Sequence, residues 1–497
     1  MPGAPVRIGP FIGGINTLSD PSALGDQELV SCINYELDLD GSLLSRPPIT
    51  DEGNGPGGTS LYVLGYGVFS GNTYMFVSAS DGTYYYLNGV YTKITSVVSS
   101  AMVQYADKIW LVSATTNGGS WEPTGGYTPV ATMPKGEETL MLKGRMYIAA
   151  GKNAATNRSR LYYSDPTDPN TWDVSGFIDI NPGDGQALVD IVVFNDNLVL
   201  FKDDSTYVLA FDVSPTNATL RLISSTIGAT RRRCVVLHEQ TMYVYHEGNV
   251  YEVVNYDFSR LNSKVIFAYD PGAFGTLNDE VFICLLGDRL VVRYYSKVYV
   301  FGLRTRTWTQ WESLLPFGPL LPAPSNVTQA VNNQYYGGSA STNNHKLYRI
   351  DDGFGISRTE PITCYIKTKN YDVAVSHKYK RLFWWGVDVN TINPVSGAVT
   401  PVIFSFVPTW GMLAQYTWGE LATWGSPLNS ATVRTDGVVT NSGGIRRFIK
   451  FLKGIRFRQV YFEVTLTNDG TSSEAPVRLF NLTIIVDTKE DVVQSVS

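Results

Sequence analysis

Five acidic residues stand in turn-like segments where a carboxylate could act as a general acid or base. They are Asp165 and Asp168 in SDPTDPNTW, Asp203 and Asp204 in FKDDSTY, and Glu247 in HEGN. Paired carboxylates are the catalytic groups of glycoside hydrolases. In turns, however, acidic side chains more commonly hydrogen-bond to nearby backbone. We therefore expect these residues to shape turns, and we assign no catalytic residue and no enzymatic activity.

Two short segments imitate ligand-binding motifs. GNGPGG at 53–58 has the spacing of a dinucleotide-binding loop, but it follows RPPITDE rather than a strand, and Pro56 stands where a helix should begin. ELDLDG at 36–41 imitates the start of a calcium loop, but the twelfth position is Pro47 instead of glutamate. An acidic turn ending at Gly41 is the preferred interpretation. No cofactor is expected.

The four histidines do not have the spacing of a metal site. They are His238, His246, His345 and His377, and only the first two share one segment, at i and i+8. That separation places them on opposite sides of a turn rather than on one helical face. We expect isolated histidines and no metal ion.

Basic residues gather in two places. The first cluster is Arg231, Arg232 and Arg233, and the second is Arg446, Arg447, Lys450, Lys453, Arg456 and Arg458. Both suit contact with another subunit or with DNA, and both equally suit the solvated faces of strands. The formal net charge is −6, which argues against a domain that grips nucleic acid. Between the two functional interpretations, subunit contact is favoured over DNA.

Five tryptophans are concentrated towards the carboxy terminus: Trp384, Trp385, Trp410, Trp418 and Trp424. Flat aromatic rings can stack on the apolar faces of sugars, so such a group can form a glycan-binding platform. They can also fill the core of a β-domain or an interface. Packing is the preferred interpretation.

The elements that must position these residues are strands. The chain of 497 residues is 43% hydrophobic and only 17% charged, with 46 Gly and 30 Tyr, a mixture that favours strands and turns. A polar turn followed by a Tyr- and Val-rich strand recurs seven times from Asn72 to Asn332, at intervals of 35 to 53 residues. One propeller blade needs about 40 to 50 residues. The pattern predicts an all-β protein with a β-propeller of about six or seven blades over 59–355. A two-sheet sandwich with similar hairpins is the alternative.

The flanking segments have different patterns. Residues 1–58 are rich in Gly, Pro and Asp, which predicts an extended amino-terminal arm and linker. Residues 356–497 contain longer alternating strands, which predict a carboxy-terminal β-sandwich. The four cysteines are singly spaced and expected to be free and buried. The longer apolar stretches last six or seven residues, so no membrane-spanning segment is expected.

Several segments resemble the β-propeller proteins of bacteriophage tails, a family that includes tail nozzle proteins, packaged-DNA stabilisation proteins and minor tail proteins. FIGGINTLSDPSALGDQELVSCINYELDLDGSLLSRPPI at 11–49 is similar to the opening of that family, with its Gly-Gly-Ile start, Gly-x-Leu turn and Arg-Pro. RLYYSDPTDPNTWD, LVLFKDDSTYVLAF and IGATRRRCVVLHEQTMYVYHEGNVYEV resemble its successive blades.

The resemblance implies a structural component of a phage tail, of nozzle or tail-tip type. It implies a homo-oligomeric ring, with six subunits as the family expectation, around a DNA exit channel that viral DNA passes transiently. Other tail or connector proteins would be partners, and the protein would reside in the virion tail after assembly in the host cytoplasm. The alternative is a propeller that binds or hydrolyses host-surface glycan through the turn acids or the tryptophans.

Overall fold

The computed structural model describes most of the amino-terminal two thirds of the chain and the strands of the remainder. The described residues are 5–57, 60–212, 214–267, 281–294, 297–312, 321–322, 334–338, 346–351, 362–371, 380–390, 395–404, 437–439, 445–457, 459–468 and 478–487. Their regular structure is β-strand apart from two 3₁₀ turns, Pro182–Asp184 and Pro215–Asn217. The predicted all-β class is therefore confirmed. Among the described residues, no helix has the length and apolarity needed to cross a membrane.

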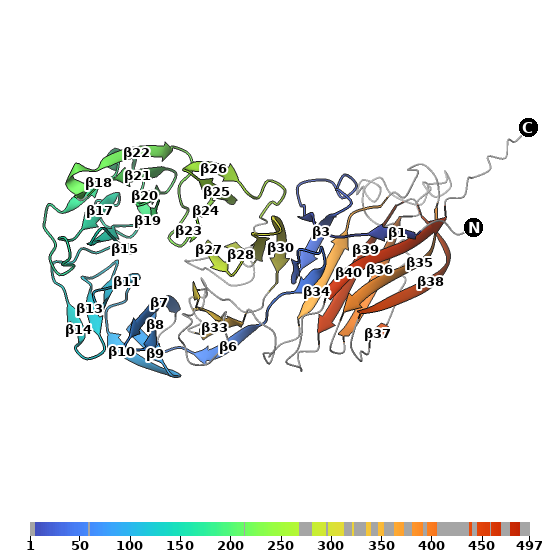
Figure 1. The fold of residues 1–497 in the computed structure, drawn as a ribbon, viewed down its shortest axis with the longest axis horizontal. Coiled ribbons are helices and arrows are strands. Elements are labelled where there is room, and N and C mark those ends of the chain that lie inside the picture. Colours follow the sequence, from blue (N-terminus) through green and yellow to red (C-terminus); the bar gives the residue numbers. More distant parts are fainter. Residues whose placement is uncertain are drawn as a thin grey trace, which may run out of the picture.

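Seven four-stranded antiparallel blades make up the propeller in the described part of the chain (Figure 1). Blade 1 is β7 (Leu61–Phe69), β8 (Asn72–Ala79), β9 (Gly82–Leu87) and β10 (Val90–Thr95); blade 2 is β11 (Ala101–Tyr105), β12 (Lys108–Val112), β13 (Gly119–Glu122) and β14 (Gly126–Pro129); blade 3 is β15 (Glu138–Leu142), β16 (Arg145–Ala149), β17 (Arg160–Tyr163) and β18 (Phe177–Asp179); blade 4 is β19 (Leu188–Phe194), β20 (Asn197–Lys202), β21 (Thr206–Ala210) and β22 (Thr219–Ser224). Blade 5 is β23 (Val235–His238), β24 (Thr241–His246), β25 (Asn249–Val254) and β26 (Asp257–Arg260); blade 6 is β27 (Val281–Leu286), β28 (Arg289–Tyr294), β29 (Lys297–Gly302) and β30 (Thr307–Trp311); blade 7 is β31 (Leu321–Pro322), β32 (Gln334–Gly337), β33 (Lys346–Asp351) and β6 (Ile49–Asn54).

The blades are built from tight hairpins whose sequences suit the turns. Asn195 and Asp196 join β19 to β20 with φ of 49° and 59°. A two-residue hairpin of this kind requires positive φ at both turn positions, a conformation that Asn and Asp tolerate better than most residues. The first strand of each blade lies towards the centre of the ring and the last lies at the rim (Figure 1).

Aromatic side chains fill the space between neighbouring blades. Trp121 of blade 2 packs edge-on against Phe69, Tyr74 and Phe76 of blade 1, with ring centroids 5.2 to 5.7 Å apart. Edge-to-face pairs at such distances add to the free energy gained by burying the rings. The high aromatic content of the sequence therefore serves the contacts between blades.

The sandwich contains two sheets that share one hydrophobic core. The first runs β38 (Ile445–Phe457), β35 (Lys380–Asn390), β40 (Arg478–Asp487), β5 (Leu43–Ser45) and β4 (Tyr35–Leu37), with β1 (Pro5–Ile8) paired to β40. The second runs β3 (Glu28–Ile33), β34 (Thr363–Thr368), β39 (Gln459–Asn468), β36 (Val395–Phe404) and β37 (Gly437–Val439), with β2 (Gly14–Ile15) paired to β3. Leu482 of the first sheet and Phe462 of the second belong to the same buried cluster.

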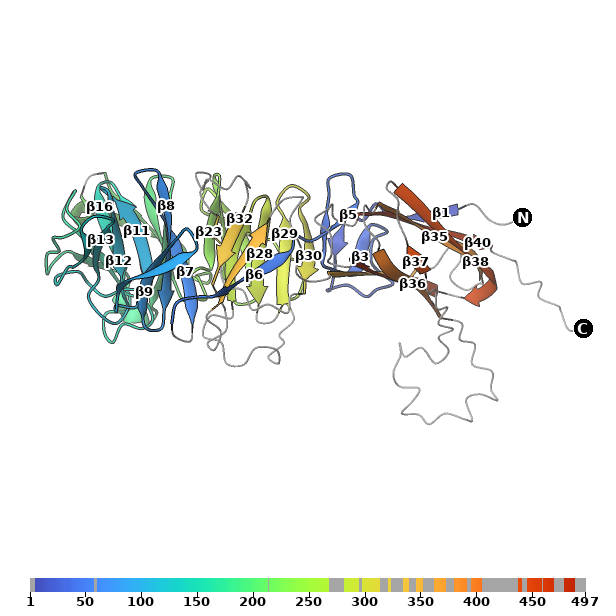
Figure 2. The same cartoon turned by 90° about the horizontal axis from the view of Figure 1, so that it is seen from below.

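The second sandwich sheet is continuous with blade 6. Ile33 of β3 pairs in parallel with Gln310 of β30, and β3 pairs on its other side with β34. Strand order therefore runs from the centre of the propeller, through blade 6, into the sandwich without a break. Figure 2 shows the result as a flat propeller with the sandwich extending from one rim.

The amino-terminal 58 residues differ from the expected arm and linker. Strands β1 to β5 belong to the sandwich, and β6 is the outermost strand of blade 7. The ring thus closes by pairing a strand from the beginning of the chain with β33, nearly three hundred residues later. The physical reason is that these short strands, with Gly and Pro mostly between them, need no long apolar run of their own when their partners are distant strands of an existing sheet.

Candidate functional site

The first arginine cluster lies at the centre of the propeller. Arg231, Arg232 and Arg233 form the turn that enters β23, the first strand of blade 5, and all three are partly buried. Arg233 has a φ of 62°, which turns the backbone sharply just before the strand. The following residue, Cys234, is fully buried, and this burial raises the pKa of its thiol to about 12. The turn is therefore anchored at its carboxy-terminal end.

The arginine side chains reach across the ring. Arg232 Nη1 donates to the carbonyl oxygen of Ser100 at 3.3 Å, and Arg233 Nη2 donates to that of Val63 at 3.4 Å. Both guanidinium groups also lie about 6 Å from the ring centroid of Tyr62, close enough for a cation–π interaction. Val63 belongs to blade 1 and Ser100 directly precedes blade 2.

Blades 1 and 2 are those opposite blade 5. In a ring of seven, each lies three blades away from blade 5 along one direction or the other. The arginine turn therefore bridges the middle of the propeller, where its charge lies against carbonyl oxygens and an aromatic face. The interpretation of this cluster as a contact for another subunit or for DNA stays a prediction; within the chain, the side chains of Arg232 and Arg233 bond to blades 1 and 2.

A buried carboxylate accompanies the arginine turn. Asp190 on β19 accepts hydrogen bonds from the N–H groups of Ile191 at 2.8 Å and Arg233 at 3.1 Å. Burial raises the pKa of Asp190 well above its usual range, and the carboxylate of Glu138 raises it further. The two N–H donors and the charge of Arg233 oppose this rise. Glu138 lies on the first strand of blade 3, so acidic groups from two blades flank the turn.

Replacing Asp190 with asparagine is expected to remove a pH-dependent loss of stability. The pKa of Asp190 is higher in the folded chain than in the unfolded chain. Its contribution to the free energy of unfolding is therefore fully present below the unfolded pKa of about 3.9, and it is lost as the pH rises through the folded pKa. Each unit of that difference is worth about 1.4 kcal/mol. Asparagine has one acceptor oxygen, which can take the place of one of the two oxygens that accept from Ile191 and Arg233, and it has no proton to lose.

Thermal unfolding measured from about pH 4 to pH 8 tests this expectation. The midpoint of the Asp190→Asn variant should exceed that of the wild type by a margin that grows with pH. Asp196→Asn, in an exposed turn of the same blade, is the control and should follow the wild-type profile. A margin that stays constant across the range would contradict the assignment.

The second basic cluster lies on strand β38. This strand pairs with β35 on one side and is the edge of its sheet within the described residues. Arg446 pairs with Val389, Lys450 with Trp385 and Arg456 with Arg381. Arg447 and Lys453 belong to the same strand, whereas Arg458 lies outside the described residues. The cluster therefore follows the backbone of an open sheet edge.

One of the predicted turn acids shapes its own turn, and a second bonds to a more distant segment. Asp168 accepts from the backbone N–H of Asn170 at 3.1 Å and from Thr171 Oγ1 at 2.7 Å. The hydrogen bond from Thr171 is the main reason why the pKa of Asp168 is lowered. Asp203 accepts from the N–H of Ala187 at 2.8 Å. The interpretation of Asp168 as turn-forming is confirmed, whereas the hydrogen bond of Asp203 joins its turn to a residue sixteen positions earlier.

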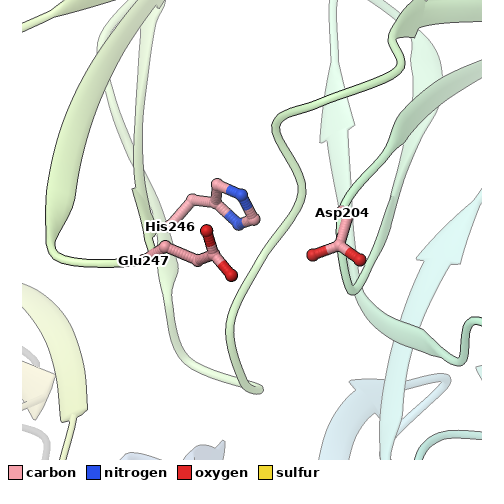
Figure 3. Close-up of side chains that lie close together, drawn as sticks. All are labelled: Asp204, His246 and Glu247. Atoms are coloured by element: carbon pink, nitrogen blue, oxygen red, sulfur yellow. The ribbon is translucent and has the colours of Figure 1, made fainter.

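Two other acids and one histidine behave differently. Asp204 of blade 4 lies beside His246 and Glu247 of blade 5, with one potential ligand atom from each within 4.8 Å of the others (Figure 3). His246 was expected to be isolated, and this expectation is wrong. Of the other histidines, His238 lies on β23, while His345 and His377 are outside the described residues.

The tryptophan group cannot be assembled into a platform from the described residues. Trp384 and Trp385 lie on β35, which is paired on both sides by β38 and β40. Trp410, Trp418 and Trp424 fall outside the described part of the chain. The four cysteines, by contrast, are free and buried as predicted.

A side chain that the motif search did not single out ties the two domains together. Asn34 follows β3, and its Nδ2 donates to the carbonyl oxygen of Thr363, the first residue of β34, at 2.8 Å. Its Oδ1 accepts from the N–H of Glu312, directly after blade 6, at 2.8 Å and from Arg46 Nε at 2.9 Å. Arg46 is itself buried and donates to the carbonyl oxygens of Pro47 and Glu312.

The residues of this junction stand in the segment that carries the phage-tail resemblance. That segment contains Asn34 and the Arg46-Pro47 pair. It also contains Gly41, which forms the turn between β4 and β5 with a φ of 79°. The acidic turn predicted to end at Gly41 is confirmed, because Gly41 N–H donates to the carbonyl oxygen of Asp38 at 3.0 Å. A Cβ atom on Gly41 would collide with Pro10.

Comparison with known proteins gives the fold alone. No family profile matches the chain, and no curated protein matches it. Among solved structures, it is similar to BBS1N in complex with ARL6DN (12% identity, TM-score 0.42, 61% of this chain and 97% of that chain) and to the WD40 β-propeller domain of Doa1 (8%, 0.42, 62% and 98%). It is also similar to PorZ of the type-IX secretion system of Porphyromonas gingivalis (12%, 0.40, 66% and 43%). Likeness at this level carries no information on function.

Proposed function

We propose that this protein is a structural component of a bacteriophage tail, of nozzle or tail-tip type. Its subunits form a homo-oligomeric ring around the DNA exit channel and dock neighbouring tail proteins. The proposal assigns no catalytic role to any residue. It starts from the resemblance of residues 11–49 and of three blade segments to phage tail propeller proteins.

The observation that carries the proposal is the continuous sheet that connects the two domains. Blade 6 and the sandwich share a continuous sheet through β30, β3 and β34. The Asn34 side chain adds hydrogen bonds to Thr363, Glu312 and Arg46 at the same place. If the two domains cannot rotate freely, a contact made by the sandwich also fixes the orientation of the propeller. Subunits packed in a ring of a tail need such a fixed orientation.

The centre of the propeller also favours a structural role. In many propellers the central channel is where ligands and substrates bind, but here Arg232 and Arg233 extend across it to blades 1 and 2. Their hydrogen bonds link blade 5 to the opposite blades 1 and 2, and the buried Asp190 links the arginine turn to the neighbouring blade 4. This arrangement suits a structural subunit better than an enzyme that needs an open axial pocket.

The edge strand β38 offers a surface for assembly. An unpaired sheet edge presents backbone N–H and C=O groups that can pair with another chain. Its positions Arg446, Arg447, Lys450, Lys453 and Arg456 put positive charge along that edge, while the formal net charge of the whole chain is −6. A basic edge meeting an acidic face of the next subunit would provide complementary charge.

The first test is the mass of the purified full-length protein by light scattering, together with negative-stain imaging before and after mixing with tail fractions. Rings, or incorporation into tails, are the expected result. A stable monomer that never joins tails, and that depolymerises host polysaccharide, would overturn the proposal and support a glycan-acting propeller instead.

A charge-reversal variant makes this test specific. Arg446→Glu with Lys450→Glu is expected to abolish rings or reduce incorporation at least about tenfold, because close like charges at an interface cost several kcal/mol. Lys135→Glu with Arg158→Glu makes the same change at exposed propeller positions and should assemble as the wild type does. Equal loss of assembly in both variants would assign the effect to net charge and count against β38 as the contact.

A further inference from the structure

Three residues from two neighbouring blades bring potential metal ligands together. Asp204 lies in the turn between β20 and β21 of blade 4, whereas His246 ends β24 and Glu247 follows it in blade 5. One ligand atom of each lies within 4.8 Å of the others. Figure 3 shows the imidazole of His246 beside the carboxylate of Glu247, with the Asp204 carboxylate facing both from the adjacent blade.

The imidazole supplies a second, independent indication of a ligand. The side chain of His246 is only 5% exposed, and its Nδ1 atom is buried without a hydrogen-bond partner among the described residues. Buried polar atoms in folded proteins are nearly always satisfied, so an exception calls for a missing partner. A metal ion held by the imidazole and the two carboxylates is such a partner.

The charge around the site is also unbalanced. The adjacent Asp203 carboxylate is paired with Lys152, with Nζ 2.5 Å from Oδ1. No ion pair involves Asp204 or Glu247 within the described residues. Two carboxylates this close repel one another unless a cation lies between them. Both are exposed at the surface, so a metal ion can reach them from solvent.

Backbone hydrogen bonds hold the turns that carry the ligands in place without a bound ion. Glu247 has a φ of 44°, and its N–H donates to Thr230 Oγ1 at 3.0 Å. Gly248 N–H donates to the hydroxyl of Tyr245 at 2.9 Å, which holds the next position of the turn. On the other blade, Asp204 N–H donates to Gln186 Oε1 at 3.3 Å. Pre-formed turns on both blades reduce the ordering that binding would require.

We infer that Asp204, His246 and Glu247 form a binding site for one divalent first-row transition metal ion, with Zn²⁺ as its representative. An imidazole nitrogen with two carboxylate oxygens suits such ions, whereas Mg²⁺ and Ca²⁺ prefer oxygen ligands alone. Three protein ligands leave a coordination position for water. The ion links blade 4 to blade 5 beside Thr230, directly before the arginine turn. This inference is independent of the proposed tail function.

The test uses full-length protein without a histidine tag, stripped of metal by a chelator and titrated with ZnCl₂ by calorimetry. One Zn²⁺ per chain is expected, bound at least about tenfold more tightly than Mg²⁺. Zn²⁺ should also raise the thermal midpoint, since an ion that binds only the folded state stabilises it. Absence of a one-to-one binding event would overturn the inference.

Variants assign the ligands. His246→Gln and Glu247→Gln should each weaken Zn²⁺ binding at least about tenfold, a loss expected even for outer-shell partners of a metal. His238→Gln, on the first strand of the same blade, is the matched control and should bind as the wild type does. Should His246→Gln fail to fold, the exposed Glu247→Gln variant carries the test alone. Unchanged affinity in Glu247→Gln, or equal loss in His238→Gln, would overturn the assignment.

A cobalt substitution separates this site from the cysteines. Co²⁺ bound by nitrogen and oxygen gives weak visible bands, whereas a thiolate ligand adds an intense near-ultraviolet charge-transfer band. We expect the weak bands alone, because all four cysteines are buried. A thiolate band at one equivalent of Co²⁺ would place the ion elsewhere and contradict the inference.

Discussion

A chain lacking residues 1–54 is expected to fail to fold, rather than to form a propeller without an arm. The deletion removes β6, whose residues Ile49 to Asn54 pair with β33 and close the ring. It exposes Tyr348 and Ile350, which are buried in the same cluster as Ile49. It also leaves Arg349 without its ion pair to Glu52, where Nη1 lies 2.6 Å from Oε1. An unclosed blade 7 would in turn expose the adjacent blades.

The deletion also removes sandwich strands, so a point substitution isolates the effect of ring closure. Ile49 is fully buried, and Ile49→Ala should lower the free energy of unfolding by about 3 kcal/mol, whereas Ile49→Val should cost about 1 kcal/mol. Val90→Ala on the exposed rim strand of blade 1 is the control, with a change within about 0.5 kcal/mol.

Urea unfolding followed by circular dichroism, with gel filtration of each variant, measures these effects. The deleted chain should elute as aggregate or expanded monomer and show no cooperative transition. A monodisperse deletion product with a native spectrum, or an Ile49→Ala variant as stable as Val90→Ala, would show that β6 is not needed to close the propeller.

Replacing Asn34 with glycine is expected to lower the free energy of unfolding by about 3 kcal/mol, because three hydrogen bonds worth about 1 kcal/mol each are lost. The buried Arg46 would lose the acceptor of its Nε–H, and the carbonyl oxygen of Thr363 would lose a donor. Since these bonds join blade 6 to the sandwich, we expect calorimetry to show one unfolding transition for the wild type and two for the variant.

Two further variants separate the side chain from the backbone. Asn34 has a φ of 59°, which glycine adopts freely and alanine does not, so Asn34→Ala should be destabilised by about 1 kcal/mol beyond Asn34→Gly. Asn195→Gly makes the same change at an exposed turn residue with a φ of 49° and should change stability by less than about 0.5 kcal/mol. Equal stability of Asn34→Gly and Asn195→Gly would contradict the role of the junction.

The propeller was predictable because each blade is specified locally. A turn such as Asn195-Asp196 and the short apolar strands on either side of it encode one hairpin, and similar hairpins recur at intervals of 35 to 53 residues. The sandwich strands were predictable for the same reason, because β39 and β40 alternate over ten residues each. Each such unit can be recognised from its own segment, without knowledge of the distant residues that it contacts.

The amino-terminal segment was not predictable in this way. Its strands are two to six residues long, and their partners are β40, β34 and β33, several hundred residues away. Short strands with Gly and Pro between them have the composition of a linker. These strands become ordered only by pairing with strands that are already part of a sheet. Amino-acid composition does not indicate that pairing.

The residues of the candidate site were also predictable only in part. Sequence identified Asp204 and Glu247 as notable acids and Arg231 to Arg233 as a basic cluster, because residue type and local context are visible in the chain. In the sequence, however, His246 lies forty-two residues after Asp204. The arginines were interpreted as a contact with another subunit or with DNA. The stacking of blade 4 on blade 5 brings the metal ligands together, and the seven-blade ring brings the arginines to blades 1 and 2.

The β-class, the repeating hairpins, the tight turns and the burial of the cysteines could be read from the sequence, because these features depend on neighbours within about ten residues or on residue type. Tertiary structure alone decided how the ring closes, where the domains are joined and which polar side chains meet. Those outcomes depend on which sheet edges and blade faces come together once the chain has closed. Asn34 is the clearest case, since its three side-chain partners, Arg46, Glu312 and Thr363, become neighbours only in the folded protein.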